Sequence, residues 1–230
     1  MLKRTRTTSD SKKVKRVRLR LTFFSRIMEV LGNTEKYFAG VKKERYGEPL
    51  LYYLPFMVLS ALFGAFTFPK YFPEYLTFQV SGILFLLVFV SEIVLQLAVL
   101  FFMTWLIHFC LRICKGQGQY LDTFKAGVYG STPILLWNIL SGLLTLVLWQ
   151  TQMFLNFSSS LASFLPGIAF MIWSIFLEVT GLSLYHKITK LRAFLAGVLL
   201  PLEVLFVALF AVVLFFFFFG VALFAGMMGG

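Results

Sequence analysis

Five polar side chains interrupt long apolar stretches of the chain, and they are the first candidates for chemistry. They are Glu92, Gln96, Asn138, Glu178 and Glu203. Where such a stretch crosses a bilayer, a charged side chain costs several kcal/mol or is neutralised, so an acid there is a functional candidate. One interpretation is a proton or cation path through Glu92, Gln96, Asn138 and Glu178. The other, which we favour, is that these groups join helices, with protonated carboxyls donating hydrogen bonds worth about 0.6–2 kcal/mol each.

The remaining reactive side chains form no pattern of a known catalytic or metal site. His108, Cys110 and Cys114 lie close in sequence, but they contain no C-x-x-C pair of the kind that zinc sites use. Their spacing favours packing of the cysteines at a span end, with acylation as the alternative. The sequence has no Walker loop, G-x-S-x-G, H-E-x-x-H or Rossmann fingerprint. We therefore predict that the protein is not an enzyme and binds no cofactor or metal ion.

The composition indicates an integral membrane protein. Of the 230 residues, 59% are hydrophobic, 13% are charged and 29 are Phe. Soluble domains carry about 25% charged residues, so this chain has more apolar surface than water can cover. The mean hydropathy of +0.85 leads to the same conclusion.

Five apolar segments are long enough to cross a membrane as helices, which takes about 20 residues. The sequence therefore predicts an all-α integral membrane protein, a bundle of about five transmembrane helices within a membrane domain of residues 50–230. The second segment is over-long and must tilt, kink or project from the bilayer. The predicted spans are residues 50–68, 80–111, 128–150, 161–185 and 196–226.

Residues 1–49 form a strongly basic N-terminal segment. They hold 14 of the 21 Lys and Arg and five acids, a net charge of +9. Apolar residues spaced by three and four from Val14 to Leu31 predict an amphipathic helix on the membrane surface; the alternative is a solvated charged segment. Because the segment is tethered to a bilayer, we expect it to bind anionic lipid headgroups and no nucleic acid. The basic residues on its other faces are Lys15, Arg16, Arg18, Arg20 and Arg26.

The distribution of basic loops predicts the orientation of the chain. Loops 112–127 and 186–192 carry net charges of +2 and +3, and with five spans both lie on the same side as the N-terminal segment. Basic loops stay on the cytoplasmic side. The N-terminus is therefore predicted to be cytoplasmic and the C-terminus external or lumenal. Asn156 begins a glycosylation sequon on the external side, but its loop is short and apolar, which argues against modification.

Two segments resemble a known family in their order and spacing. The Yip family (Ypt/Rab-interacting membrane proteins) begins its membrane domain with a segment similar to residues 32–56, GNTEKYFAGVKKERYGEPLLYYLPF. Its cytoplasmic loop, with a Gly-rich turn, a short helix, a Tyr and then Thr-Pro, is similar to residues 116–136, GQGQYLDTFKAGVYGSTPILL. The chain has ERYGEP at residues 44–49 where eukaryotic members have an acidic DLYGP motif. It therefore resembles the short members outside the vesicle-trafficking group.

This resemblance implies a polytopic membrane protein with no known catalytic activity. Studied eukaryotic members act in vesicle trafficking and bind prenylated Rab-type GTPases. We predict a non-enzymatic interaction protein or a membrane-organising or trafficking-related protein, whose partners are the lipid bilayer and other membrane proteins or a small GTPase. The alternative is a small transporter or ion-conducting protein that uses Glu92 and Glu178. Transporters often have inverted repeats and broken helices, whereas Pro133 and Pro201 lie at span starts and no repeat is evident.

Overall fold

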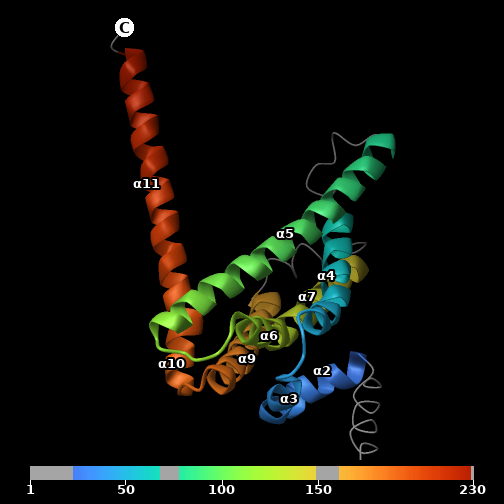
Figure 1. Cartoon of the computed structure of the whole chain (residues 1–230). Helices are drawn as coiled ribbons and strands as arrows, with labels where there is room; N and C mark the ends of the chain where they lie inside the picture. The colour runs from blue at the N-terminus through green and yellow to red at the C-terminus, as the bar shows by residue number, and fades with distance from the viewer. Residues whose placement is uncertain (1–22, 68–77, 149–160, 229–230) are drawn as a thin grey trace, which may run out of the picture.

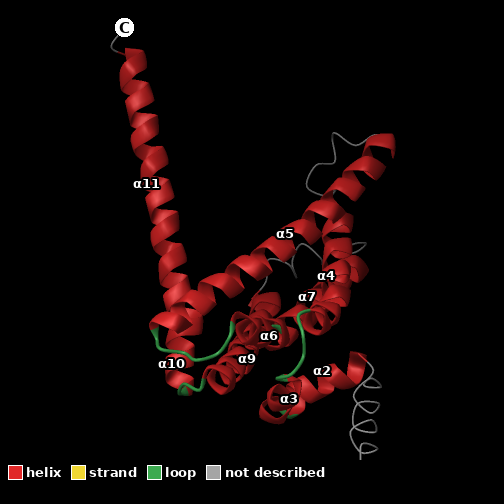
Figure 2. Ribbon diagram, viewed as in Figure 1, coloured by secondary structure: helices red, strands yellow, loops and turns green. Residues whose placement is uncertain are grey.

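The computed structural model of the protein describes residues 23–67, 78–148 and 161–228. Over these ranges the regular elements are all helices, joined by short turns, and no strand is present (Figure 2). The predicted all-α class is confirmed. The elements are α2 (Phe23–Gly32), α3 (Thr34–Val41), α4 (Gly47–Thr67), α5 (Phe78–Ile113), α6 (Tyr120–Gly130), α7 (Thr132–Leu148), α9 (Leu161–His186), α10 (Lys190–Phe194), a π-helix (Leu195–Leu199) and α11 (Leu200–Met228).

Four of the described helical stretches are long and apolar enough to cross a membrane. They correspond to the predicted first, second, fourth and fifth spans. At the position of the predicted third span, α7 has 17 residues and ends where the described range ends, at Leu148. The multi-pass membrane class is confirmed, and the helix count is close to the predicted five. The four stretches are Gly47–Phe66, Gly82–Ile113, Phe164–His186 and Lys190–Phe216.

The helix of the third span starts later than the predicted residue 128, because the separate helix α6 precedes it. Residues 128–130 belong to α6, and α7 starts at Thr132. Pro133 follows and, since proline has no backbone N–H, it cannot donate to the carbonyl of Tyr129. The Thr132 hydroxyl supplies that donor instead, at 2.7 Å. The helix is therefore interrupted without leaving the Tyr129 carbonyl unpaired.

The last span starts six residues before the predicted residue 196. Its first turn, α10, begins at Lys190, where the Thr189 hydroxyl accepts a hydrogen bond from the Arg192 N–H at 3.4 Å. Five residues of π-helix follow. Pro201 lacks the N–H that would have bonded to the Gly197 carbonyl, and a π-helical turn is one way in which a helix accommodates such a loss.

The helices diverge from a common base (Figure 1). We call this base the loop end, because the turns 114–119 and 187–189 lie there together with α2, α3, α6 and α10. α5 crosses the bundle obliquely, and its 36 residues extend about 54 Å. This exceeds the roughly 30 Å of hydrocarbon in a bilayer, so a helix of this length must tilt, kink or project from the bilayer. α11 contacts α5 and the π-helix and then stands apart, with most side chains from Leu202 to Phe216 exposed.

The tightly packed core lies at the loop end. Tyr37 and Phe38 of α3 pack edge-on against Tyr129 of α6, with ring centroids 5.1 and 6.5 Å away. Phe38 also contacts Tyr185 of α9, at 5.6 Å. Gly181 permits this packing, because a Cβ there would lie 2.8 Å from the Phe38 ring. Helix α3 of the basic N-terminal segment is therefore built into the core of the bundle.

Candidate functional site

Hydrogen bonds from α6 and α9 hold the N-terminal segment against the loop end. The Tyr185 hydroxyl donates to the Phe38 carbonyl at 3.0 Å, and Lys125 Nζ donates to the Lys42 carbonyl at 2.7 Å. Lys125 is 1% exposed. Burial lowers the pKa of its ammonium, and nearby acids oppose this shift. The basic loops and the N-terminal helices therefore share one end of the described bundle.

Glu44, the first residue of the ERYGEP segment, forms a second polar contact with α6. The Tyr129 hydroxyl donates to Glu44 Oε2 at 2.5 Å, and Arg26 Nη2 lies 3.7 Å from Glu44 Oε1. Burial raises the pKa of the Glu44 carboxyl, and the Tyr129 donor and the Arg26 charge partly oppose this rise. Burial also raises the pKa of the Tyr129 hydroxyl, which keeps it a neutral donor. The segment that resembles the family motif is thus fixed to α6 through a partly buried, titratable group.

Replacing Glu44 with Gln should remove a pH dependence of stability. A carboxyl whose pKa is raised in the folded protein stabilises the fold most at a pH below its usual pKa of 4.5. That stabilisation is lost as the pH rises through the raised pKa. Across that interval the wild type should lose stability relative to Glu44→Gln, whose amide oxygen still accepts from Tyr129 and does not titrate. Unfolding in mixed micelles from about pH 4 to about pH 8 measures this difference. Parallel curves would contradict the assignment, and Glu35→Gln at the exposed surface is the matched control.

Two histidines are joined through one threonine beside the core. Thr123 Oγ1 lies 2.9 Å from His108 Nδ1 and 2.9 Å from His186 Nε2. The Gly118 N–H donates to His186 Nδ1 at 3.2 Å, so in neutral His186 the proton is on Nε2. This N–H then donates to Thr123, whose own hydroxyl proton is directed to His108. We call this series the histidine chain; it runs in one direction from the turn 114–119 through α9 and α6 to α5.

The Gly-rich turn at residues 114–119 fits closely around His186. A Cβ at Gly118 would lie 2.8 Å from the imidazole, and a Cβ at Gly116 would lie 3.0 Å from its Nδ1. The Gln117 N–H also donates to the His186 carbonyl, at 3.1 Å. The two glycines are therefore required by the approach of the turn to the end of α9.

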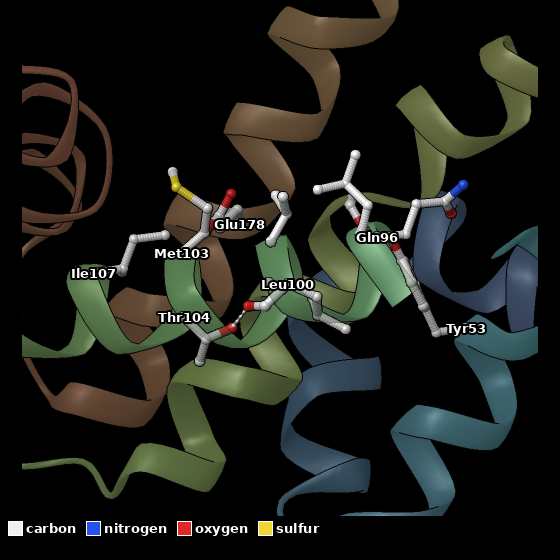
Figure 3. Close-up of a pocket in the computed structure, with 11 residues that line it drawn as sticks. Tyr53, Gln96, Leu100, Met103, Thr104, Ile107 and Glu178 are labelled. Atoms are coloured by element: carbon white, nitrogen blue, oxygen red, sulfur yellow. Dashed lines mark hydrogen bonds between the residues drawn. The ribbon is translucent and has the colours of Figure 1, made fainter. Parts of the chain in front are cut away.

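A pocket of about 390 Å³ lies between α4, α5, α6 and α9 (Figure 3). Glu178 reaches it from α9 and Gln96 from α5, while Thr104 and Ser131 add hydroxyl groups. Helices α6 and α9 meet closely beside it, because a Cβ at Gly130 would lie 2.7 Å from the Glu178 Cα. The lining residues are Tyr53, Leu95, Gln96, Val99, Leu100, Met103, Thr104, Ile107, Gly127, Ser131 and Glu178.

The pocket brings together two of the predicted intramembrane polar residues, Gln96 and Glu178. Glu92 lies elsewhere on α5, where its carboxyl is 3.6 Å from the position that a Cβ of Gly64 on α4 would take. The side chain of Asn138 is exposed on α7. The structure thus separates Glu92 and Asn138 from the pair in the pocket.

The other predicted site residues are exposed, partly buried or outside the described ranges. Glu203 is exposed at the beginning of α11. Arg26 contacts Glu44, with 24% of its side chain exposed. Phe24 and Met28, from the predicted apolar stripe, are exposed on α2. Lys15, Arg16, Arg18, Arg20 and Asn156 lie outside the described residues.

The histidine chain could not be predicted from the sequence, because its residues are far apart in sequence. Thr123 and His186 are 63 positions apart and meet only because α6 packs on α9. The closely spaced Gly116 and Gly118 were the local signal of a tight approach.

Cys110 and Cys114 are free thiols, the first buried and the second partly buried. Within the described ranges, no three His, Cys, Asp or Glu side chains are grouped to hold a metal ion.

Nearly all of the residues described above fall within one known protein domain. The family model of the Yip1 domain matches residues 28–212. The chain belongs to the Yip1 domain family. Residues of the Yip1 domain form the histidine chain and the pocket. They also form the Glu44 contact, apart from Arg26, which precedes the matched range. No curated protein and no solved structure matches the chain significantly.

Proposed function

We propose that this Yip1-domain protein is a non-enzymatic interaction or membrane-organising protein that presents its loop end to partners in the cytoplasm. The observation that supports this most is the anchoring of the N-terminal helices on α6 and α9 by hydrogen bonds from Lys125, Tyr129 and Tyr185. A surface fixed in this way loses little conformational freedom when a partner binds. The partner classes that we propose are other membrane proteins and a small GTPase.

The surface of α2 supports a second contact, with anionic lipid headgroups. Phe24 and Met28 are 76% and 70% exposed, and residues 1–22 carry nine Lys and Arg. A peripheral membrane contact has two parts: apolar side chains that enter the membrane interface, and basic residues that attract anionic headgroups. A peptide of residues 12–32 should therefore bind anionic vesicles less tightly as salt is added, which cosedimentation measures. Equal affinity for neutral vesicles would remove the electrostatic part of the proposal.

The transporter alternative has one observation in its favour, the shared pocket of Gln96 and Glu178. A conducting path needs further polar groups that lead from the pocket towards both faces of the membrane. Glu92 lies beside Gly64 of α4 and Asn138 is exposed, so neither extends the pocket. These positions favour the interaction function.

Site-specific photo-crosslinking in native membranes separates the two functions. Benzoylphenylalanine in place of Lys36, which is exposed on α3, should give a discrete protein adduct. The matched substitution at Leu209, which is 63% exposed on α11, should give lipid adducts alone. Reconstituted wild-type protein should leave a proton gradient intact. A gradient that collapses with the wild type but not with Glu178→Gln, together with no adduct at Lys36, would overturn the proposal, because an amide carries no titrating proton.

A further inference from the structure

The pocket between α5 and α9 presents hydrogen-bond acceptors and few donors. The Thr104 hydroxyl donates to the Leu100 carbonyl at 2.7 Å, the dashed line in Figure 3. The Ser131 hydroxyl donates to the Val128 carbonyl at 2.9 Å. Because both of these hydroxyl hydrogens are used, the two hydroxyls offer a ligand only oxygen lone pairs, while Gln96 and Tyr53 can both donate and accept. When it is ionised, the carboxylate of Glu178 adds two further acceptor oxygens.

Glu178 has no protein partner for those oxygens. Among the described residues, no ion pair or hydrogen bond reaches its carboxyl group, and no Lys or Arg lines the pocket. An ionised carboxylate in an apolar setting is costly unless a cation or a hydrogen-bond donor accompanies it. A ligand that brings a positive charge and several donors would complete this site.

Most of the α5 side chains that line the pocket are apolar, and this lining continues to the outer side of α5. Leu95 and Val99 line the pocket and are also 59% and 49% exposed. A molecule dissolved in the bilayer can therefore enter sideways, with a hydrocarbon chain along α5. The volume of about 390 Å³ falls within the 300–1,000 Å³ or so that is typical of small-molecule sites. The absence of Lys and Arg from the lining argues against a phosphate group on the ligand.

We propose that this pocket binds a long-chain primary amine, with its ammonium group at Glu178 and its alkyl chain along Leu95 and Val99. An ammonium has three donors and no acceptor, which matches the oxygens of Glu178, Thr104 and Ser131. A long-chain alcohol offers one donor without charge, and a fatty acid would place a second carboxylate beside Glu178. The site lies apart from the proposed partner surface at the loop end, and neither depends on the other.

The test uses the full chain in phosphatidylcholine nanodiscs, labelled with a diazirine-bearing dodecylamine and mapped by mass spectrometry. Label should concentrate on the α5 segment around Leu100 and Met103. Dodecylamine should displace it at concentrations about tenfold to a hundredfold lower than dodecanol or dodecanoate. Glu178→Gln should raise the required dodecylamine concentration by about tenfold or more, whereas Glu203→Gln, which removes an exposed carboxyl of α11, should leave it unchanged.

A second variant keeps the test decisive if Glu178→Gln fails to fold. A Cβ at Gly127 would meet only Thr104 Oγ1, at 3.9 Å, so Gly127→Leu has room to extend into the pocket and should abolish the label on α5. Thermal unfolding confirms that each variant is folded. Label spread evenly over α5 and α11, equal displacement by dodecanoate, or unchanged label in Gly127→Leu would each overturn the proposal and leave partitioning into the bilayer as the explanation.

Discussion

Gly130→Ala should lower the free energy of unfolding by about 2–3 kcal/mol, the usual cost of overpacking a core position that cannot relax. The new methyl group would lie 2.7 Å from the Cα and Cβ of Glu178 and 2.8 Å from its backbone nitrogen. Two of these atoms belong to the backbone of α9, so the contact can be relieved only by moving α6 away from α9. Unfolding in mixed micelles, followed by tryptophan fluorescence, measures the loss.

The matched control for this substitution is Gly40→Ala in α3. A Cβ at Gly40 meets nothing within 4 Å, and alanine within a helix is favoured over glycine by up to about 1 kcal/mol. The two substitutions should therefore change stability in opposite directions. Equal unfolding midpoints for Gly130→Ala and the wild type would show that α6 and α9 are not held at the observed distance.

Thr123→Val should cost about 2–4 kcal/mol, because it keeps the shape of the side chain and strands two imidazole nitrogens. His186 is 0% exposed, and its Nε2 proton has Thr123 as its acceptor at 2.9 Å. His108 Nδ1 loses its donor at the same time. Each buried polar group left without a partner costs about 1–3 kcal/mol. Chemical denaturation in mixed micelles measures the sum.

Two further variants isolate the hydroxyl of Thr123 from its methyl group. Thr123→Ser retains the hydroxyl and should recover most of the loss. Thr180→Val removes a hydroxyl that donates only to the Phe176 carbonyl of its own helix, at 2.8 Å, and should cost less than about 1 kcal/mol. Similar losses for Thr123→Val and Thr180→Val would argue against a histidine chain held by Thr123.

The helices of the fold were predictable where apolar length alone decides the structure. The long apolar segments around residues 50, 80, 161 and 196 all form the expected helices. The family resemblance included a short helix where α6 lies, but nothing in the sequence indicated that Lys125, one of the basic residues of loop 112–127, is buried. Its ammonium donates to the Lys42 carbonyl and its stem is buried. A sequence shows the charge of such a lysine but not the distant carbonyl that satisfies it.

The candidate sites depended on helix rotation and crossing, which apolar periodicity does not determine in a membrane helix. Gln96 of α5 and Glu178 of α9 share a pocket, and beside it Gly130 lets α6 approach α9 next to Glu178. Glu92, one turn before Gln96 on α5, lies instead beside Gly64 of α4. The polar residues were recognisable from the sequence. Which neighbours they meet depends on close helix contacts at individual glycines such as Gly64 and Gly130.

The hydrogen bond between Tyr185 and Phe38 has a consequence for biogenesis at the ribosome. It joins residues 147 positions apart, so its acceptor is synthesised long before its donor. At about 5–20 residues per second, that interval is about 7–30 s. During it, α3 has emerged while α9 has yet to reach the membrane, and the Phe38 ring has neither Tyr185 nor Gly181 to cover it. The nascent N-terminal helices must therefore be sheltered by lipid or by the insertion machinery until the fourth span is in place.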